Sequence, residues 1–399
     1  MNRLRSAVQG LTPIGRETRS LTSIPRRVLL VGLACLAAAF FPDTVATQAP
    51  ASLDPPGPRV SITPAPAIVL PGGVDSNSPA IWLTDDGVSE LAVMTSTAGA
   101  PHLAFGPALN RLGAAQDVVF DPNPGNGVWM EAVVVDDEGT WYGYYHHENP
   151  AVGCGRPDRA VARIGAARSF DGGRTWEDLG VILEAATASI ACDSPNRYVI
   201  GGVGDLSVML NDAKTDLYIF FSQYHRQVTA QGVAVARLVW ANRDRPTGRV
   251  TVWNAGAWLP SRINRMETTD VFGNIRRVWR EYPVGTPIEP TTLAWHDGDG
   301  KVDAFWGPSV HWNESIERYV MLLNRAKDES YSQDGIYVSF APRLDDPDLW
   351  TTPQLVMAGG KWYPQVIGLT PGSGTDKAAG STARLFVGGR SEWLINFSR

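Results

Sequence analysis

The sequence predicts an all-β fold, and three observations favour a single five-bladed β-propeller. Apolar runs of strand length, rich in Val, Ile, Tyr, Phe and Trp, recur along the chain and are broken by Gly, Asp, Asn and Pro. No long stretch keeps the period of an amphipathic helix. The runs fall into five similar groups of about four strands, a repeat typical of blades set around an axis. Two packed β-sheets are the alternative arrangement.

The groups can be assigned in chain order from their turn residues and apolar runs. The expected strands are 78–83, 90–96, 102–106 and 117–120; then 128–136, 140–146, 162–170 and 179–184; then 206–210, 217–223, 233–240 and 250–253; then 309–313, 319–324, 336–340 and 354–357; and last 365–369, 385–388 and 393–397. The last group is one strand short. The early strand 67–70 can complete it, which would join the two ends of the chain and cover a sheet edge.

Composition agrees with a large β domain. The chain has 399 residues, 44% of them hydrophobic, with 40 Gly and 29 Pro, and all-β domains of this size form single units. The 14 Trp suit either a sugar-binding cleft or a Trp-rich propeller core. The formal net charge of −6 provides no overall basic field, so nucleic acid is not an expected partner.

The N-terminus has the pattern of an export signal. Six arginines lead to an apolar run from Val28 to Phe41, which small and polar residues follow. The run is short for a membrane span, although an uncleaved anchor is the alternative. We therefore expect residues 1–49 to be a signal peptide and N-terminal extension, 50–66 a linker rich in Pro and Ala, and 67–399 the propeller. The mature protein is expected to be exported, periplasmic or extracellular, monomeric, and without a stable membrane span.

Two cysteines remain once the signal segment is set aside. In an exported chain, Cys154 and Cys192 are expected to form a disulfide; two buried free thiols are the alternative. Neither cysteine has the neighbours of a zinc site, because the chain lacks CxxC and HxxxH spacings. We expect no metal ligands and no cofactor, although a structural ion in a central channel stays open.

One local motif lies at 169–176. The segment from Ser169 to Trp176, SFDGGRTW, resembles the Asp-box hairpin of sialidases and other glycosidase propellers. Asp171 can bond the amides of its own turn, the glycines allow positive φ, and Trp176 can pack under the hairpin. The motif is therefore expected to support the fold rather than to take part in catalysis.

Polar residues recur where the first strand of each group begins. Asp75, Glu131, Asp205 and His311 occupy such places among apolar neighbours. In a propeller the first strands line the central channel, so these side chains are expected to meet at one mouth. An unpaired buried charge is costly, which favours a functional set over a channel that merely holds the blades together.

This arrangement resembles the five-bladed glycosidases that include arabinanases, β-xylosidases, invertases, levansucrases and neoagarooligosaccharide hydrolases. The resemblance implies that Asp75 acts as base or nucleophile and that Asp205 tunes the acid or holds the sugar. The usual acid is a Glu that opens a later blade. This chain departs from that pattern because its fourth group offers His311, as in the neoagarooligosaccharide hydrolases, while Glu131 is the competing acid.

Further polar and aromatic residues are candidates for substrate binding. The expected set is Asn77, Tyr144, His146, Glu148, Arg168, Trp312 and Gln365. Each has a structural alternative: the cluster 144–148 can cap a strand at a wet rim, and Trp312 can pack between blades. Regular strand alternation turns His146 and His147 to opposite faces, so both cannot bind one metal.

These expectations define two classes of function. The first is a secreted glycoside hydrolase that acts on an oligo- or polysaccharide by acid/base hydrolysis. The second is a non-catalytic carbohydrate-binding or scaffold propeller. The feature that separates them is whether Asp75, Asp205 and either Glu131 or His311 share a pocket.

Overall fold

The computed structural model describes residues 57–85, 87–265, 269, 271–275, 279–298 and 300–399. The predicted signal peptide and the first part of the linker lie outside these residues. Pro56–Arg399 forms one compact unit. In the described part of the chain, no helix is long and apolar enough to cross a membrane.

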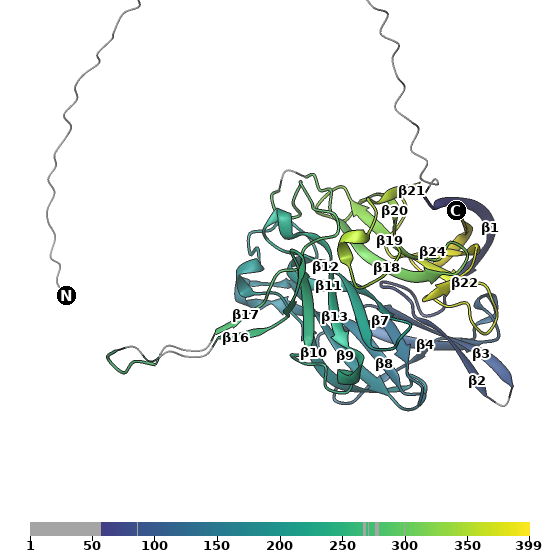
Figure 1. Ribbon diagram of the computed structural model, residues 1–399, viewed down its shortest axis with the longest axis horizontal. Coiled ribbons are helices and arrows are strands. Elements are labelled where there is room, and N and C mark those ends of the chain that lie inside the picture. Colours follow the sequence, from purple (N-terminus) through teal and green to yellow (C-terminus); the bar gives the residue numbers. More distant parts are fainter. Residues whose placement is uncertain (1–56, 86, 266–268, 270, 276–278, 299) are drawn as a thin grey trace, which may run out of the picture. The chain divides into compact units, whose positions relative to one another are not determined.

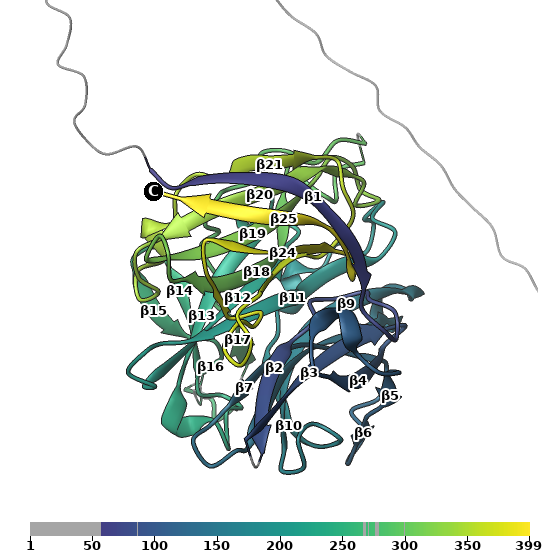
Figure 2. The ribbon, with the colours of Figure 1, turned by 90° about the vertical axis from the view of Figure 1, so that its right-hand side faces the viewer.

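The unit is a β-propeller in which five groups of four strands pair in antiparallel order (Figures 1 and 2), and a short parallel pairing joins the second and third groups into one hydrogen-bonded sheet. The blades are, from inner to outer strand, β2 Ala80–Asp85, β3 Val88–Thr97, β4 Ala100–Gly106 and β5 Gln116–Asp117; β7 Val128–Val135, β8 Trp141–Ala151, β9 Arg156–Ser169 and β10 Thr175–Leu183; β11 Val199–Leu210, β12 Asp216–Gln223, β13 Gly232–Val239 and β14 Val250–Asn254; β18 Phe305–Asn313, β19 Arg318–Ala326, β20 Gln333–Ala341 and β21 Gln354–Ala358; β22 Pro364–Gly368, β24 Thr382–Val387, β25 Arg390–Ser398 and β1 Arg59–Val69. The fold class expected from the sequence is therefore confirmed.

Short elements complete the described chain. The remaining strands are β6 Val119–Phe120, β15 Ala257–Pro260, the hairpin β16 Ile263–Arg265 and β17 Trp279–Glu281, and β23 Ala378–Ala379. The described helices are 3-10 turns, namely η1 Leu109–Arg111, η2 Val152–Cys154, η3 Thr187–Ser189, η4 Val228–Ala230, η5 Trp240–Asn242 and η6 Pro347–Leu349.

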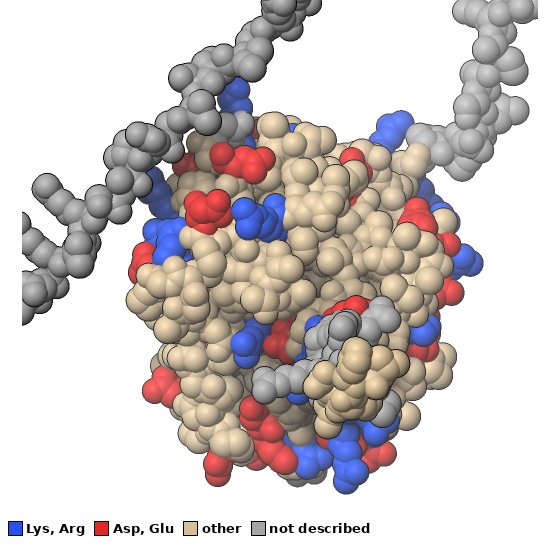
Figure 3. All heavy atoms as spheres, turned by 90° about the vertical axis from the view of Figure 1, so that its left-hand side faces the viewer, with Lys and Arg blue, Asp and Glu red and all other residues tan. Residues whose placement is uncertain are grey.

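On the face in Figure 3, acidic and basic side chains are interspersed and form no single basic patch.

The two ends of the described chain close the last blade. Strand β1 pairs antiparallel with β25, from Arg59 opposite Ser398 to Val69 opposite Arg390 (Figure 2). The expected completion of the fifth blade is thus observed, but the strand starts at Arg59, so residues 59–66 are strand and not linker. Val60 and Ile62 pack on the core of this blade. As an edge strand, β1 tolerates the proline at 64, where its register becomes irregular.

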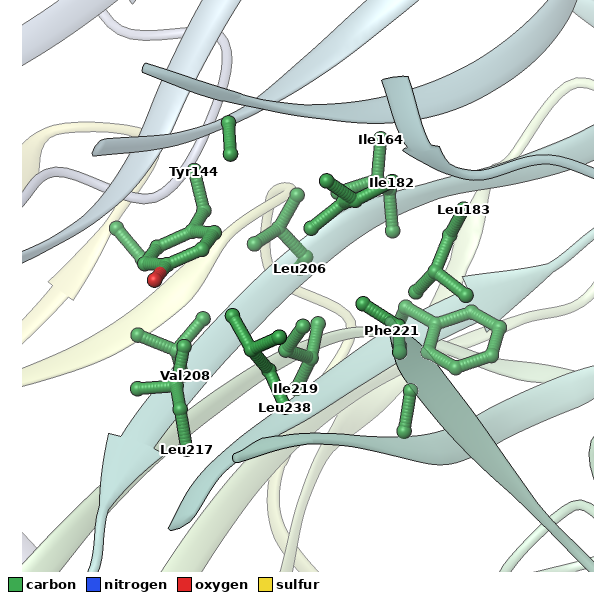
Figure 4. Close-up of a cluster of buried hydrophobic side chains, with 14 of the residues drawn as sticks. Tyr144, Ile164, Ile182, Leu183, Leu206, Val208, Leu217, Ile219, Phe221 and Leu238 are labelled. Atoms are coloured by element: carbon green, nitrogen blue, oxygen red, sulfur yellow. The ribbon is translucent and has the colours of Figure 1, made fainter. Parts of the chain in front are cut away.

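Apolar side chains fill the spaces between neighbouring blades. Figure 4 shows the cluster between blades two and three, which includes Ile164 of β9 together with Leu206 and Ile219. Tyr144 lies in this cluster with a relative exposure of 1%. Its expected role in substrate binding is therefore wrong, because its strand turns it into the interblade core.

The expected local supports are present near the second blade. Cys154 and Cys192 form a disulfide with Cα atoms 5.2 Å apart, as predicted. In the 169–176 turn, Asp171 accepts hydrogen bonds from the amides of Arg174 and Thr175 at 3.1 and 2.9 Å. Trp176 is buried against Trp141. These contacts give the turn the structural role expected of its residues.

The inner strands of three blades share one irregularity. Their pairing registers shift at Glu131 in β7, at Asp205 in β11 and at Gly307 and Pro308 in β18. A bulge redirects the side chain it carries and commonly lies beside functional sites. Asp205 has φ 37°, a left-handed conformation that is uncommon for residues other than glycine. The bulges therefore define equivalent places at one end of the inner strands.

Two predicted sugar-binding residues instead tie the blades together. Asn77, just before β2, donates from Nδ2 to the carbonyls of Leu206 and Pro308 at 2.9 and 2.8 Å. Gln365 of β22 exchanges two 2.9 Å hydrogen bonds with the backbone of Ser78. Both amides are buried and committed to backbone partners. Asn77 and Gln365 therefore match the alternative hypothesis for the polar channel, in which its side chains hold neighbouring blades together.

Candidate functional site

A cavity of about 150 Å³ opens where these inner strands begin. We call it the inner cavity. Its lining combines carboxyl, imidazole and aromatic groups: Asp75, Trp129, His146, Glu148, Tyr198, Val199, Asp205, Tyr224, Trp306, Tyr331, Trp362 and Tyr363. Small-molecule sites have this character, with apolar walls and a few convergent polar groups. The cavity is therefore the candidate functional site.

Asp205 is held by three donors. Its carboxylate accepts a hydrogen bond from the hydroxyl of Tyr224, and the hydroxyl of Tyr363 lies 3.3 Å from Oδ1. The third is Nδ1 of His146, 3.2 Å from Oδ1. Donors from β8, from the end of β12 and from the start of β22 thus fix one carboxylate. Such a carboxylate is oriented before any ligand arrives.

Glu131 lies beneath His146, outside the residues that line the cavity. Its Oε2 accepts a 2.6 Å hydrogen bond from the amide of Leu206, and its Oε1 lies 3.6 Å from Nδ1 of His146. Burial raises the pKa of Glu131. Burial alone would lower the pKa of His146, but the nearby carboxylates of Asp205 and Glu131, 3.2 and 3.6 Å from Nδ1, outweigh it, and the pKa is raised. The surrounding carboxylates therefore favour the protonated form of His146, while the amide of Asp205 also lies 3.1 Å from Nδ1.

Asp75 and Glu148 are the carboxyl groups most open to a ligand. Burial, with repulsion from Asp205 and Glu148, raises the pKa of Asp75 to about 6. Burial also raises the pKa of Glu148, whose Oε1 lies 3.7 Å from Nε2 of His146. Carboxyl groups whose pKa values are raised toward neutral pH can donate and accept protons efficiently there, and they are typical of active sites.

The aromatic wall is rigid. The ring of Tyr331 lies edge-on to Trp306 at 4.9 Å, and the indole of Trp362 donates a 2.8 Å hydrogen bond to the carbonyl of Tyr331. Tyr331 and Tyr363 have φ values of 58° and 56°. Non-glycine residues in this region cost conformational energy and cluster at functional sites. Their rings are held by the surrounding structure, which suits a preformed binding surface.

A larger depression adjoins the inner cavity. This outer groove has a volume of about 460 Å³ and shares Asp75, Tyr331, Trp362 and Tyr363 with the inner cavity. Its other lining residues are Val74, Ser330, Ser332, Gln333, Gly360, Lys361 and Gly388. Asp75 therefore lies where the two spaces meet.

The structure does not bring His311 to the inner cavity. His311 lies four residues beyond Gly307 on β18, about 13 Å further along the strand at the usual rise per residue. It is 1% exposed, its ring lies 5.6 Å from that of Phe397, and neither ring nitrogen has a hydrogen-bond partner among the described residues. Burial, with the nearby charge of Lys377, lowers its pKa to about 3. The expectation that His311 shares the pocket was wrong.

Two further candidates lie elsewhere. Arg168 pairs with Glu177 at 2.8 Å and with Asp244 at 3.0 Å on the outer part of blade two, so it does not reach the channel. Trp312 packs against Tyr319 with ring centroids 4.8 Å apart, which is its structural alternative. Of the predicted site residues, Asp75, His146, Glu148 and Asp205 line the inner cavity, with Glu131 beneath them.

The aromatic side chains that line the inner cavity were not among the residues expected from the sequence. Trp306 and Tyr363 stand next to the positions of blades four and five that match Asp205, so aligning the groups on that aspartate would have found them. Tyr198 and Tyr331 lie in loops outside the inner strands, where the sequence carries no comparable signal.

A cation could be held beneath the inner cavity. Glu131, His146 and Asp205 present ligand atoms within 4.8 Å of one another, and the buried Oε1 of Glu131 has no hydrogen-bond partner in the described part of the chain. Carboxylate oxygens with one imidazole suit a divalent cation. The same atoms suit the imidazolium described above, so a proton on His146 and a metal ion would compete for this cluster.

No model of a protein family and no curated protein matches the chain. Solved structures that are similar include an endo-arabinase from Bacteroides thetaiotaomicron, with 11% identity, TM-score 0.42 and coverage of 83% of this chain and 97% of that one. An α-L-arabinanase from Penicillium chrysogenum has 12% identity, TM-score 0.41 and coverage of 81% and 83%. A protein of unknown function from Dyadobacter fermentans has 9% identity, TM-score 0.42 and coverage of 85% and 100%. Similarity at this level does not assign an activity.

Proposed function

We propose that the protein is an exported glycoside hydrolase that cleaves an oligo- or polysaccharide in the inner cavity. One observation carries the proposal: Asp75, Glu148 and Asp205 line a single cavity whose remaining wall is largely aromatic. Aromatic faces stack on the apolar faces of sugar rings, while carboxylates accept hydrogen bonds from sugar hydroxyls. Most glycoside hydrolases cleave the glycosidic bond with a pair of carboxyl groups, one on each side of it.

Asp75 is proposed as the base or nucleophile. With a pKa of about 6, it is mostly ionised at neutral pH and still basic enough to accept a proton. The proton donor is then Glu148, in place of the two donors expected from the sequence. His311 lies outside the cavity. Oε2 of Glu131 accepts a hydrogen bond from the amide of Leu206, which favours the ionised form of Glu131. Burial and the charge of Asp205 favour the protonated form of Glu148.

Asp205 and His146 are proposed to hold the sugar and to set the field around it. The donors on Asp205 leave it oriented toward the cavity, where it can accept hydrogen bonds from sugar hydroxyls. The positive charge of His146 offsets part of the repulsion between Asp205, Glu131 and Glu148. Glu131 supports that charge from below and does not need to touch the substrate.

The test is a screen of the purified full-length protein against aryl glycosides and plant, fungal and algal polysaccharides. We expect turnover of at least one of them, reduced about 10²–10⁴-fold in Asp75→Asn and Glu148→Gln. Asp244→Asn and Glu177→Gln are matched controls, because both carboxylates pair with Arg168 outside the cavity. Equal losses in the variants and their controls would remove the catalytic assignment.

A carbohydrate-binding propeller without catalysis is the second candidate. The observation in its favour is that blades four and five contribute Trp306, Trp362 and Tyr363 to the inner cavity, and no carboxylate of theirs is among its described lining residues. This candidate predicts saturable sugar binding by the native protein with no turnover of any substrate.

A further inference from the structure

The site consists of two spaces of unequal size with one carboxylate between them. The inner cavity measures about 150 Å³ and the outer groove about 460 Å³. A cavity of about 150 Å³ accommodates one six-membered ring such as benzene. The inner cavity is therefore too small for more than one sugar ring, whereas the larger groove has room for more than one.

The junction between the two spaces is well defined. Asp75 and the rings of Tyr331, Trp362 and Tyr363 line both of them. The wall is fixed by the hydrogen bond from Trp362 to the Tyr331 carbonyl and by the 2.9 Å bond from the Tyr363 amide to Oδ1 of Asn324. A ligand that fills both spaces must pass Asp75.

The chemistry of the two spaces also differs. The inner cavity carries the carboxyl and imidazole groups, among them Asp205, His146 and Glu148. Apart from Asp75 and the shared rings, the outer groove has neutral polar groups, Ser330, Ser332 and Gln333, and one cation, Lys361, among its described lining residues. Hydroxyls, an amide and an ammonium can bind sugar hydroxyls without taking part in proton transfer.

We propose that the substrate is an oligosaccharide bound by its end, an inference that rests on the proposed function. One terminal sugar occupies the inner cavity, the glycosidic bond lies beside Asp75, and the following sugars lie in the outer groove against Trp362 and Lys361. With Asp75 as base, Asp75 takes a proton from water as the water oxygen bonds to the anomeric carbon and the bond to the leaving oxygen breaks. Glu148 gives its proton to that leaving oxygen, so one water is consumed and two sugar hydroxyl groups are formed. The enzyme therefore removes one sugar at a time from a chain end.

The first experiment follows product lengths over time with arabino-, xylo- and manno-oligosaccharides of two to six units. We expect the monosaccharide and the chain shortened by one unit in equal amounts from the earliest time points. Internal products at early times, such as a dimer and a trimer from a pentamer, would overturn the proposal while leaving hydrolysis itself intact. No hydrolysis of any probe would instead count against the proposed function.

The second experiment tests the outer groove and does not depend on turnover. Calorimetry with Asp75→Asn measures affinity for the same sugars from one to six units. Affinity should rise from one unit to three, and Lys361→Gln in that background should weaken trisaccharide binding about tenfold, the effect of one hydrogen bond to a charged group. Lys214→Gln, an exposed lysine paired with Asp137, is the control. Affinity that is independent of length, or an equal effect of both lysine variants, would refute the two-space arrangement.

Discussion

Replacing Asp75 with asparagine is expected to stabilise the protein while it lowers activity about 10²–10⁴-fold. The pKa of Asp75 is raised to about 6 from an ordinary 3.8, mainly by burial. A raised carboxyl pKa means that the folded state binds a proton more tightly than the unfolded state does. Stability is therefore lost as the pH rises from about 3.8 to about 6, and the whole loss is present at pH 7. Asparagine is isosteric and carries no charge, so it removes this loss.

The magnitude follows from the shift in pKa. Each pKa unit corresponds to about 1.4 kcal/mol, so ionising Asp75 in the folded protein costs about 3 kcal/mol at neutral pH. Because Asp75 is partly open to water, we reduce this to about 1–2 kcal/mol. Asp75→Asn should then raise the free energy of unfolding by about 1–2 kcal/mol at pH 7 and leave it nearly unchanged at pH 4.

Urea unfolding followed by tryptophan fluorescence at both pH values measures this difference. Asp244→Asn is the control with the opposite sign, because hydrogen bonds to Asp244 from Tyr142 and Arg168 overcome its burial and lower its pKa. That variant should be less stable at pH 7. If Asp75→Asn is unchanged or destabilised at pH 7, the burial and repulsion assigned to Asp75 are wrong.

Three further predictions follow from the structure. The double variant Cys154→Ser, Cys192→Ser should lose about 2–4 kcal/mol of stability and should raise KM, because the disulfide closes 38 residues and anchors the segment that leads to Tyr198; an unchanged KM would remove the link to the site. Asp171→Ala should cost about 1–2 kcal/mol in unfolding experiments without changing kcat, since its bonds lie within its own turn; a loss of kcat would contradict that role. In a pH–rate profile, kcat/KM should fall below about pH 6 as Asp75 becomes protonated, and a profile that is flat from pH 5 to 7 would rule Asp75 out as the base.

The strands and their grouping could be predicted from the sequence because each depends on local patterns. Apolar runs between turn residues marked the blades, and the missing fifth-blade strand pointed to the N-terminal segment that pairs with β25. The start of that strand was missed because the Pro- and Ala-rich composition of residues 50–66 suggested a linker. An edge strand needs few ladder hydrogen bonds and accepts such a residue.

The candidate site could be predicted only in part. Whether a side chain reaches the cavity depends on its position along the inner strand as well as on which strand carries it. Asp205 and Glu131 lie at bulges, and their counterpart on β18 is Gly307. His311 belongs to the same strand but lies four residues deeper, where the interblade contacts bury it. The same holds on β8, where Tyr144 and His146 are two residues apart and therefore share a face. Tyr144 lies deeper, in the interblade core, whereas His146 reaches the inner cavity.

The leaving-group dependence of Glu148→Gln tests the central claim most directly. A proton donor matters for natural glycosides, whose leaving alcohols need a proton, and matters little for aryl glycosides with acidic phenols. The measurement is kcat/KM for wild type and Glu148→Gln across aryl glycosides of graded phenol pKa and one oligosaccharide. The account predicts a loss of about 10²–10⁴-fold on the oligosaccharide that shrinks steadily toward the most acidic phenol. Equal losses on all substrates, or none, would contradict carboxyl catalysis by Glu148 in the inner cavity.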